Sequence, residues 1–167
     1  MRILGIDPGT ATTGYGVVDY QAGREKMVTY GTIKTDSGMA MPLRLYQIKL
    51  QLEQLMQEYL PDKVAVEEIF YNRNSKTVIS VAQSRGVILM TSAAAGLPVL
   101  EYTPLQVKQA VVGYGNAEKR QVQLMVQRIL GMKEIPRPDD AADALAIAIC
   151  GLHSNRLEGQ GLRGKGL

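Results

Sequence analysis

The feature that most constrains the fold of this chain is a change in the spacing of its hydrophobic residues. Residues 2–6 form a short apolar run that stops at the turn sequence DPGT (7–10), which predicts a buried strand. Two further strand-like runs, 14–20 and 26–33, are separated by the short segment 21–24. Because strands joined by such short connections pair in opposite directions, this region predicts an antiparallel meander of three strands.

The period becomes helical from 42 to 60, where apolar residues recur every three or four positions. The rest of the chain mixes strands and helices, with strands expected at 64–69 and 98–102 and helices at 77–95, 104–112, 118–130 and 138–153. We therefore expect an α/β fold whose five-stranded mixed sheet, the meander plus two parallel strands, carries helices on both faces. We expect one domain at 1–155, followed by a basic, Gly-rich tail at 156–167 that is disordered.

Composition sets a few bounds on location and on partners. No apolar run approaches the roughly 18 residues that a membrane span needs, and the chain enters a strand at once, so we expect no membrane span and no signal peptide. The single cysteine, Cys150, lies in an apolar stretch, which fits a buried side chain in a reducing, cytoplasmic protein. A net charge of +3 and an isoelectric point near 9.0 permit binding to a polyanion without requiring it.

Acidic residues stand at the ends of two predicted buried strands. Asp7 closes the first strand, where a carboxylate is costly unless it pairs with another group or binds a cation, although an Asp can also simply cap the following turn. The strand at 64–69 contains Glu67 and Glu68, which point to opposite faces of the sheet. The pattern does not decide which of the two glutamates faces a functional site.

The segment PDDAADALAI (138–147) gives the strongest signal in the chain. Either Asp139 or Asp140 is unremarkable in a first helical turn, because the helix dipole favours acids there. Asp143 lies in the second turn between alanines, in a helix too apolar to be exposed. Asp140 and Asp143 are three positions apart and share a face. This pattern suggests a helix packed closely on a sheet, with inward-pointing carboxylates that hold a cation.

The acids favour a hard cation over zinc. Mg²⁺ takes carboxylate oxygens, waters and substrate phosphates as ligands. A His/Cys zinc site is not available from one histidine, His153, and one cysteine. Acids on two strands and a helix would suit two-metal hydrolysis of a phosphodiester, in which one ion activates a water and the other stabilises the leaving oxygen.

Two segments, 70–76 and 108–120, carry cations and backbone amides that could hold nucleic-acid phosphates. Phe70 is the only phenylalanine in the chain and stands at a strand exit, where it could stack on an unpaired base. Solvated loops and ordinary core packing of Phe70 are the alternatives. The candidate DNA-binding residues are Phe70, Arg73, Lys76, Lys108, Lys119 and Arg120.

Several motifs, taken in order, resemble the RuvC family of Holliday-junction resolvases. They are GIDPG (5–9), AVE (65–67), QSRG (83–86), VKQ (107–109), AEK (117–119) and DAADALA (140–146). The first motif is weak by itself, whereas the last is specific when the lysine-containing motifs precede it at suitable distances. The resemblance implies an RNase H-like fold, a homodimer and paired, symmetric, Mg²⁺-dependent cuts in four-way junction DNA during recombination and repair.

The resemblance also assigns residues by position. It selects Glu67 over Glu68 and Asp140 over Asp139, so that the implied catalytic and metal-binding acids are Asp7, Glu67, Asp140 and Asp143. It implies two Mg²⁺ ions per site, which Mn²⁺ could replace, and a branch-migration helicase complex as a partner. It places Lys108 and Lys119 in junction handling or catalysis, and Phe70 near the bases of the crossover.

Three other functions fit part of the pattern. The segment 5–16 also resembles the first phosphate loop of actin-like and sugar-kinase ATP-binding proteins, but those proteins clasp the nucleotide between two such domains. A small RNase H-like nuclease that acts on RNA would share the opening at 1–9 but should lack the Glu118-Lys119 pair. A junction-binding protein without catalysis is the non-enzyme alternative, and the presence of all four acids argues against it.

Overall fold

A computed structural model describes residues 1–69 and 77–161 of the chain, with the backbone alone for 155–161. The strands in this described part are β1 (Arg2–Asp7), β2 (Thr12–Gln21), β3 (Arg24–Lys34), β4 (Lys63–Glu67) and β5 (Val99–Tyr102). The helices are α1 (Met41–Tyr59), α2 (Val78–Ala94), α3 (Pro104–Val112), α4 (Lys119–Ile129) and α5 (Asp139–Gly161). Each of them corresponds to an element expected from the hydrophobic spacing.

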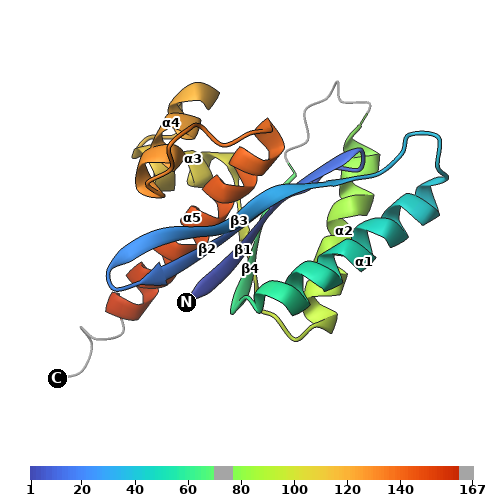
Figure 1. The fold of residues 1–167 in the computed structure, drawn as a ribbon, viewed down its shortest axis with the longest axis horizontal. Coiled ribbons are helices and arrows are strands. Elements are labelled where there is room, and N and C mark those ends of the chain that lie inside the picture. The colour runs from blue at the N-terminus through green and yellow to red at the C-terminus, as the bar shows by residue number, and fades with distance from the viewer. Residues whose placement is uncertain (70–76, 162–167) are drawn as a thin grey trace.

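The strands form one five-stranded sheet in the order β3-β2-β1-β4-β5 (Figure 1). The pairs β1–β2 and β2–β3 are antiparallel, whereas β4 runs parallel to both β1 and β5. The expected meander with two added parallel strands is therefore confirmed. The carboxyl ends of β1, β4 and β5 lie at the same edge of the sheet, because these strands are parallel.

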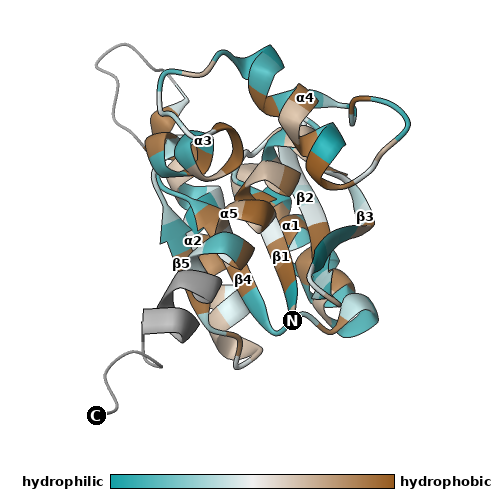
Figure 2. Ribbon diagram, turned by 90° about the vertical axis from the view of Figure 1, so that its left-hand side faces the viewer, coloured by the Kyte–Doolittle hydropathy of each residue, from teal (hydrophilic) through white to brown (hydrophobic). Residues whose placement is uncertain are grey.

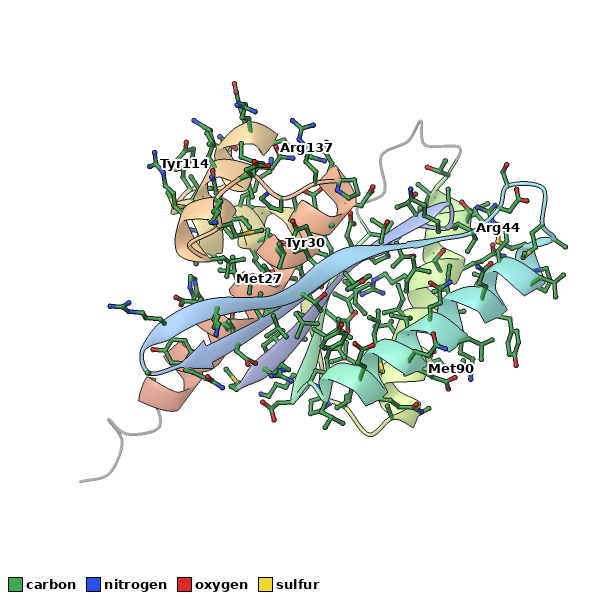
Figure 3. The ribbon with its side chains drawn as sticks, in the orientation of Figure 1. Met27, Tyr30, Arg44, Met90, Tyr114 and Arg137 are labelled. Atoms are coloured by element: carbon green, nitrogen blue, oxygen red, sulfur yellow. The ribbon has the colours of Figure 1, made fainter. Side chains whose placement is uncertain are left out.

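Helices cover both faces of the sheet, as expected (Figure 1). Leu4 and Ile6 of β1 point to the face covered by α1 and α2, and they are fully buried there. Ile3 points to the opposite face, where α5 packs along the sheet beneath α3 and α4. Met27 and Tyr30 of β3 pack against this second cluster, and Figure 3 shows both side chains on the α5 side of the strand. The alternation along β1 thus places Asp7 on the α5 face.

Helix α5 is the central element of its layer. Its described side chains from Ala144 to Leu152 are all buried, and the ribbon is predominantly hydrophobic there (Figure 2). The approach to the sheet is close because β1 and β2 carry glycines beneath it. A Cβ atom on Gly5 would lie 2.2 Å from the carbonyl oxygen of Ala144, and one on Gly14 would lie 1.9 Å from that of Asp140. Any larger residue at either position would push the helix away.

Helix α5 extends beyond its expected end at residue 153 and continues through Gly161. Residues 162–167 lie outside the described residues. Among the described helices, none has both the length and the apolar character needed to span a bilayer.

Candidate active site

Asp7 is the last residue of β1, and its side chain is largely enclosed beneath α5. Burial, followed by the nearby charges of Asp143, Glu67 and Asp140, raises the pKa of Asp7 from 3.8 to about 8. The positive charge of Lys119 lowers the pKa of Asp7. A carboxylate at this position is therefore strained electrostatically, which a turn cap exposed to solvent would not be.

Glu67 is the last residue of β4 and lies beside Asp7 at the same edge. The parallel register pairs Ile6 with Val66, so the two acids follow equivalent positions of neighbouring strands. The pKa of Glu67 is raised to about 7, because burial and the charge of Asp143 outweigh the lowering effect of Lys108 and Lys119. The odd-numbered residues of β4 face α5, since Ala65 belongs to the core on that side. This parity selects Glu67 for the site, and Glu68 faces the other way.

Asp140 and Asp143 come from the first two turns of α5, directly above the strand ends. Asp143 is half-buried, and burial raises its pKa, while a hydrogen bond and the positive charge of Lys119 lower it. Asp140 contributes to the raised pKa of both Asp7 and Asp143. The structure therefore brings together the acids that the sequence singled out at the strand ends and on the helix.

Lys119, the first residue of α4, bridges two acids of α5. Its Nζ donates a hydrogen bond to Oδ2 of Asp143 at 2.9 Å and lies 3.4 Å from Oδ2 of Asp139. Asp139 also accepts a hydrogen bond from Nε2 of Gln123 at 2.9 Å, and this bond together with Lys119 lowers its pKa. Asp139 is thus an exposed ion-pair partner, while Asp140 faces the acidic cluster.

A pocket of about 240 Å³ opens beside the acids, between the end of β4 and the helices α3, α4 and α5. Its charged lining consists of two acids and two lysines, Glu67, Asp143, Lys108 and Lys119. Apolar side chains from α3, α4 and α5 form the remaining wall. A phosphate group that entered this pocket would meet both cations beside the acids, which is an arrangement suited to a phosphodiester.

The donor set fits a hard divalent cation. In the described part of the chain, no three His, Cys, Asp or Glu side chains converge closely enough to form a ready-made metal cage. Mg²⁺ does not require one, because it is usually bound by one or two carboxylates together with waters and substrate phosphates. Burial and the neighbouring carboxylates raise the pKa of Asp7 and of Glu67, so both acids are costly to ionise without a positive charge close by. A cation bound between these acids would supply that positive charge.

The other predicted contact residues have different positions. Lys108 on α3 and Lys119 on α4 line the pocket, and Arg120 follows on the exposed first turn of α4. Phe70, Arg73 and Lys76 lie outside the described residues. Figure 3 shows Tyr114 and Arg137 in the layer of α3 and α4, on the α5 side of the sheet.

One contact at the site was not anticipated from the sequence. Arg85 of α2 reaches the end of β4, where its Nε donates to the main-chain oxygen of Glu67 at 3.1 Å. The only signal for it was its membership of the QSRG motif, to which no role had been given. Similarly, nothing local in the sequence links Gln123 with Asp139.

Comparison with known proteins gives consistent results over most of the chain. The family model described as "Crossover junction endodeoxyribonuclease RuvC" matches residues 3–151. A protein of that name from Syntrophomonas wolfei is 75% identical over 157 residues, which is 94% of this chain and 91% of the relative. Another from Caldanaerobacter subterraneus is 55% identical over 157 residues, with 94% and 95% of the two chains covered.

Solved structures agree with these sequence matches. The structure of Thermus thermophilus RuvC superimposes with a TM-score of 0.87 at 38% identity, covering 95% of this chain and 97% of that one. The T. thermophilus RuvC in complex with a Holliday junction substrate gives a TM-score of 0.85 at 35% identity, with 94% and 96% covered. The expected RNase H-like fold is therefore confirmed, and the chain belongs to the RuvC family of crossover junction endodeoxyribonucleases.

Proposed function

We propose that this protein resolves four-way DNA junctions by paired, symmetric, Mg²⁺-dependent hydrolysis of phosphodiester bonds during recombination and repair. The observation that carries the proposal is the position of Asp7 and Glu67 at neighbouring parallel strand ends, beneath Asp143 and beside a pocket with two lysines. Family membership supports the same activity, and one relative is named as a complex with its Holliday junction substrate.

Asp7, Glu67, Asp140 and Asp143 would hold the cations, which we propose to be two Mg²⁺ ions per site, with Mn²⁺ as a substitute. When bound, such ions lower the pKa of a water and stabilise the charge that develops on the leaving oxygen. The chain itself supplies the oxygen ligands and the partly water-excluded setting. We propose that Lys119, which donates to Asp143, neutralises this acid until a ligand enters, and that Lys108, whose charge acts on Glu67, holds the phosphate.

The cations near the acids would also position the DNA backbone. Lys108, Lys119 and Arg120 come from α3 and α4 on one side of the acids, and phosphate contacts there would orient a strand across the pocket. We propose that Phe70, Arg73 and Lys76, which lie outside the described residues, also contact the DNA, with Phe70 stacking on an unpaired base.

Paired, symmetric cuts require two active sites related by a two-fold axis, and we propose that the protein acts as a homodimer. The layer of α1 and α2 is the surface best suited to a second copy, since it exposes large apolar side chains, including Met90 (Figure 3). The large exposed apolar residues of these helices are Leu43, Tyr46, Leu50, Ile79 and Met90. We further propose a cytoplasmic location and cooperation with a branch-migration helicase complex.

The test is cleavage of a synthetic four-way junction by the purified protein with Mg²⁺, mapped to the nucleotide. We expect symmetric nicks in two opposing strands that ligase reseals, and no comparable cleavage of linear duplex or of RNA. Binding without cleavage would support the non-catalytic alternative, and preferential cleavage of RNA would support a nuclease of RNA. Junctions with different core sequences would define the preferred site in the same experiment.

A further inference from the structure

Arg85 connects helix α2 to the strand end that carries Glu67. In addition to the bond from its Nε to the main-chain oxygen of Glu67, its guanidinium forms an ion pair with the carboxylate of Glu101 on β5. The Arg85 side chain is 18% exposed, and its bond to the main chain of Glu67 is partly buried, whereas the carboxylate of Glu101 remains open to solvent. One planar side chain therefore joins α2, β4 and β5 at the edge of the sheet where the acids lie.

The peptide bond after Glu67 is held from two sides. Arg85 binds its carbonyl oxygen, and the amide of Glu68 donates to the carbonyl oxygen of Tyr102 at 2.8 Å. Glu67 is the last residue of β4, so the regular ladder no longer constrains the chain beyond it. The direction of the Glu67 side chain depends on its backbone orientation, which these two hydrogen bonds determine.

The same helix also anchors the turn that follows Asp7. The hydroxyl of Thr10 donates to the main-chain oxygen of Ser80 at 2.7 Å and lies 2.7 Å from the hydroxyl of Ser84, and both threonine and serine are buried. Ser84 directly precedes Arg85. Consecutive residues of α2 thus brace the ends of β1 and β4, the two strands that present Asp7 and Glu67.

We propose that Arg85 is a positioning residue, which holds the main chain of Glu67 so that the carboxylate faces Asp7 and Asp143. The inference rests on the proposed function, because it concerns the geometry of that same site. Arg85 acts through Glu67, so its loss should weaken cation binding and turnover while leaving the phosphate contacts of the lysines intact. Partners that orient metal ligands typically change metal affinity or activity by about 10–100-fold when they are removed.

Four variants separate positioning from charge and from packing. Arg85→Ala removes both interactions, and Arg85→Lys keeps the charge without the planar fork that spans the two acceptors. Glu101→Gln weakens the ion pair and leaves the bond to Glu67 in place. Arg24→Ala is the matched control, since Arg24 is exposed at the β2–β3 hairpin, at the opposite end of the sheet from Asp7.

The readouts are single-turnover cleavage of a four-way junction, junction affinity in Ca²⁺, and binding of Mn²⁺ alone by titration calorimetry. For Arg85→Ala and Arg85→Lys we expect turnover and Mn²⁺ affinity to fall about 10–100-fold, with junction affinity within about 2-fold of wild type. Glu101→Gln and Arg24→Ala should stay near wild type in all three. Thermal unfolding of each variant reports whether it folds.

Two results would overturn the inference. Full activity of Arg85→Lys would mean that charge alone matters, and equal losses in Glu101→Gln and Arg85→Ala would mean that the arginine mainly secures β5. Failure of the proposed function is a different outcome, in which wild-type protein neither binds Mn²⁺ nor cuts the junction. If wild type does both and Arg85→Ala matches it, only the role of Arg85 is refuted.

Discussion

Replacing Asp7 by Asn should make the metal-free protein more stable and, at the same time, abolish its cleavage activity. Asparagine has nearly the same shape as aspartate but carries no charge. Burial, with Asp143 and Glu67 nearby, raises the pKa of Asp7 from 3.8 to about 8 in the folded, metal-free protein. Between these values the folded state keeps a proton that the unfolded chain has lost. The stability of the metal-free protein should therefore fall as the pH rises through this range.

The magnitude follows from the two pKa values, at 1.36 kcal/mol for each pH unit of difference. Relative to a neutral side chain, Asp7 with a pKa of about 8 disfavours folding by about 3 kcal/mol at pH 6 and by about 5 kcal/mol at pH 8. The free energy of unfolding of Asp7→Asn should thus exceed that of the wild type by about 2 kcal/mol more at pH 8 than at pH 6. For a chain of 167 residues, this corresponds to roughly 4–8 °C in the melting temperature.

The assay is thermal unfolding in EDTA at pH 6, 7 and 8 for wild type, Asp7→Asn and Glu134→Gln. Glu134 is exposed in the loop before α5, and its variant controls for the change in net charge. We expect Asp7→Asn to melt above wild type, with a gap that widens toward pH 8. The same variant should bind a four-way junction normally and fail to cut it with Mg²⁺, because it lacks one metal ligand but keeps the phosphate contacts.

A constant or reversed gap between the two melting curves would refute the reasoning. It would mean that the folded state stabilises the charged form of Asp7 and that burial is not the dominant influence. Loss of junction binding together with cleavage would instead point to a structural role for Asp7.

Three further predictions concern the lysine, the helix contact and the dimer. Lys119→Ala should weaken cleavage and reduce the slope of log affinity against log salt by about 1, and an unchanged slope would argue against a phosphate contact. Gly14→Ala places a Cβ 1.9 Å from the Asp140 oxygen, so it should cost about 1–3 kcal/mol or more in denaturant unfolding and abolish cleavage. Gly86→Ala, with open space around it, should be tolerated. Met90→Glu should yield monomers in sedimentation and end paired cutting, and an intact dimer would exclude this part of the α1–α2 surface.

The order and type of the elements were predictable from the sequence, because each depends on the spacing of apolar residues within one segment. The runs before Asp7 and Glu67 identified two buried strands with acids at their ends, and the alanines around Asp143 indicated a helix lying close to a sheet. Helix α5 ends later than its apolar spacing predicted, at Gly161 instead of residue 153.

The tertiary structure alone decided which side chains meet. Local pattern left Glu67 and Glu68, and Asp139 and Asp140, equivalent, and a resemblance was needed to choose between them. In the structure, strand parity places Glu67 beneath α5, and Lys119 pairs with Asp139 from another helix. These contacts join residues that are far apart in the chain, and their distances depend on how closely the glycines of β1 and β2 let α5 approach the sheet. Such distances are properties of packing, which no single segment of sequence contains.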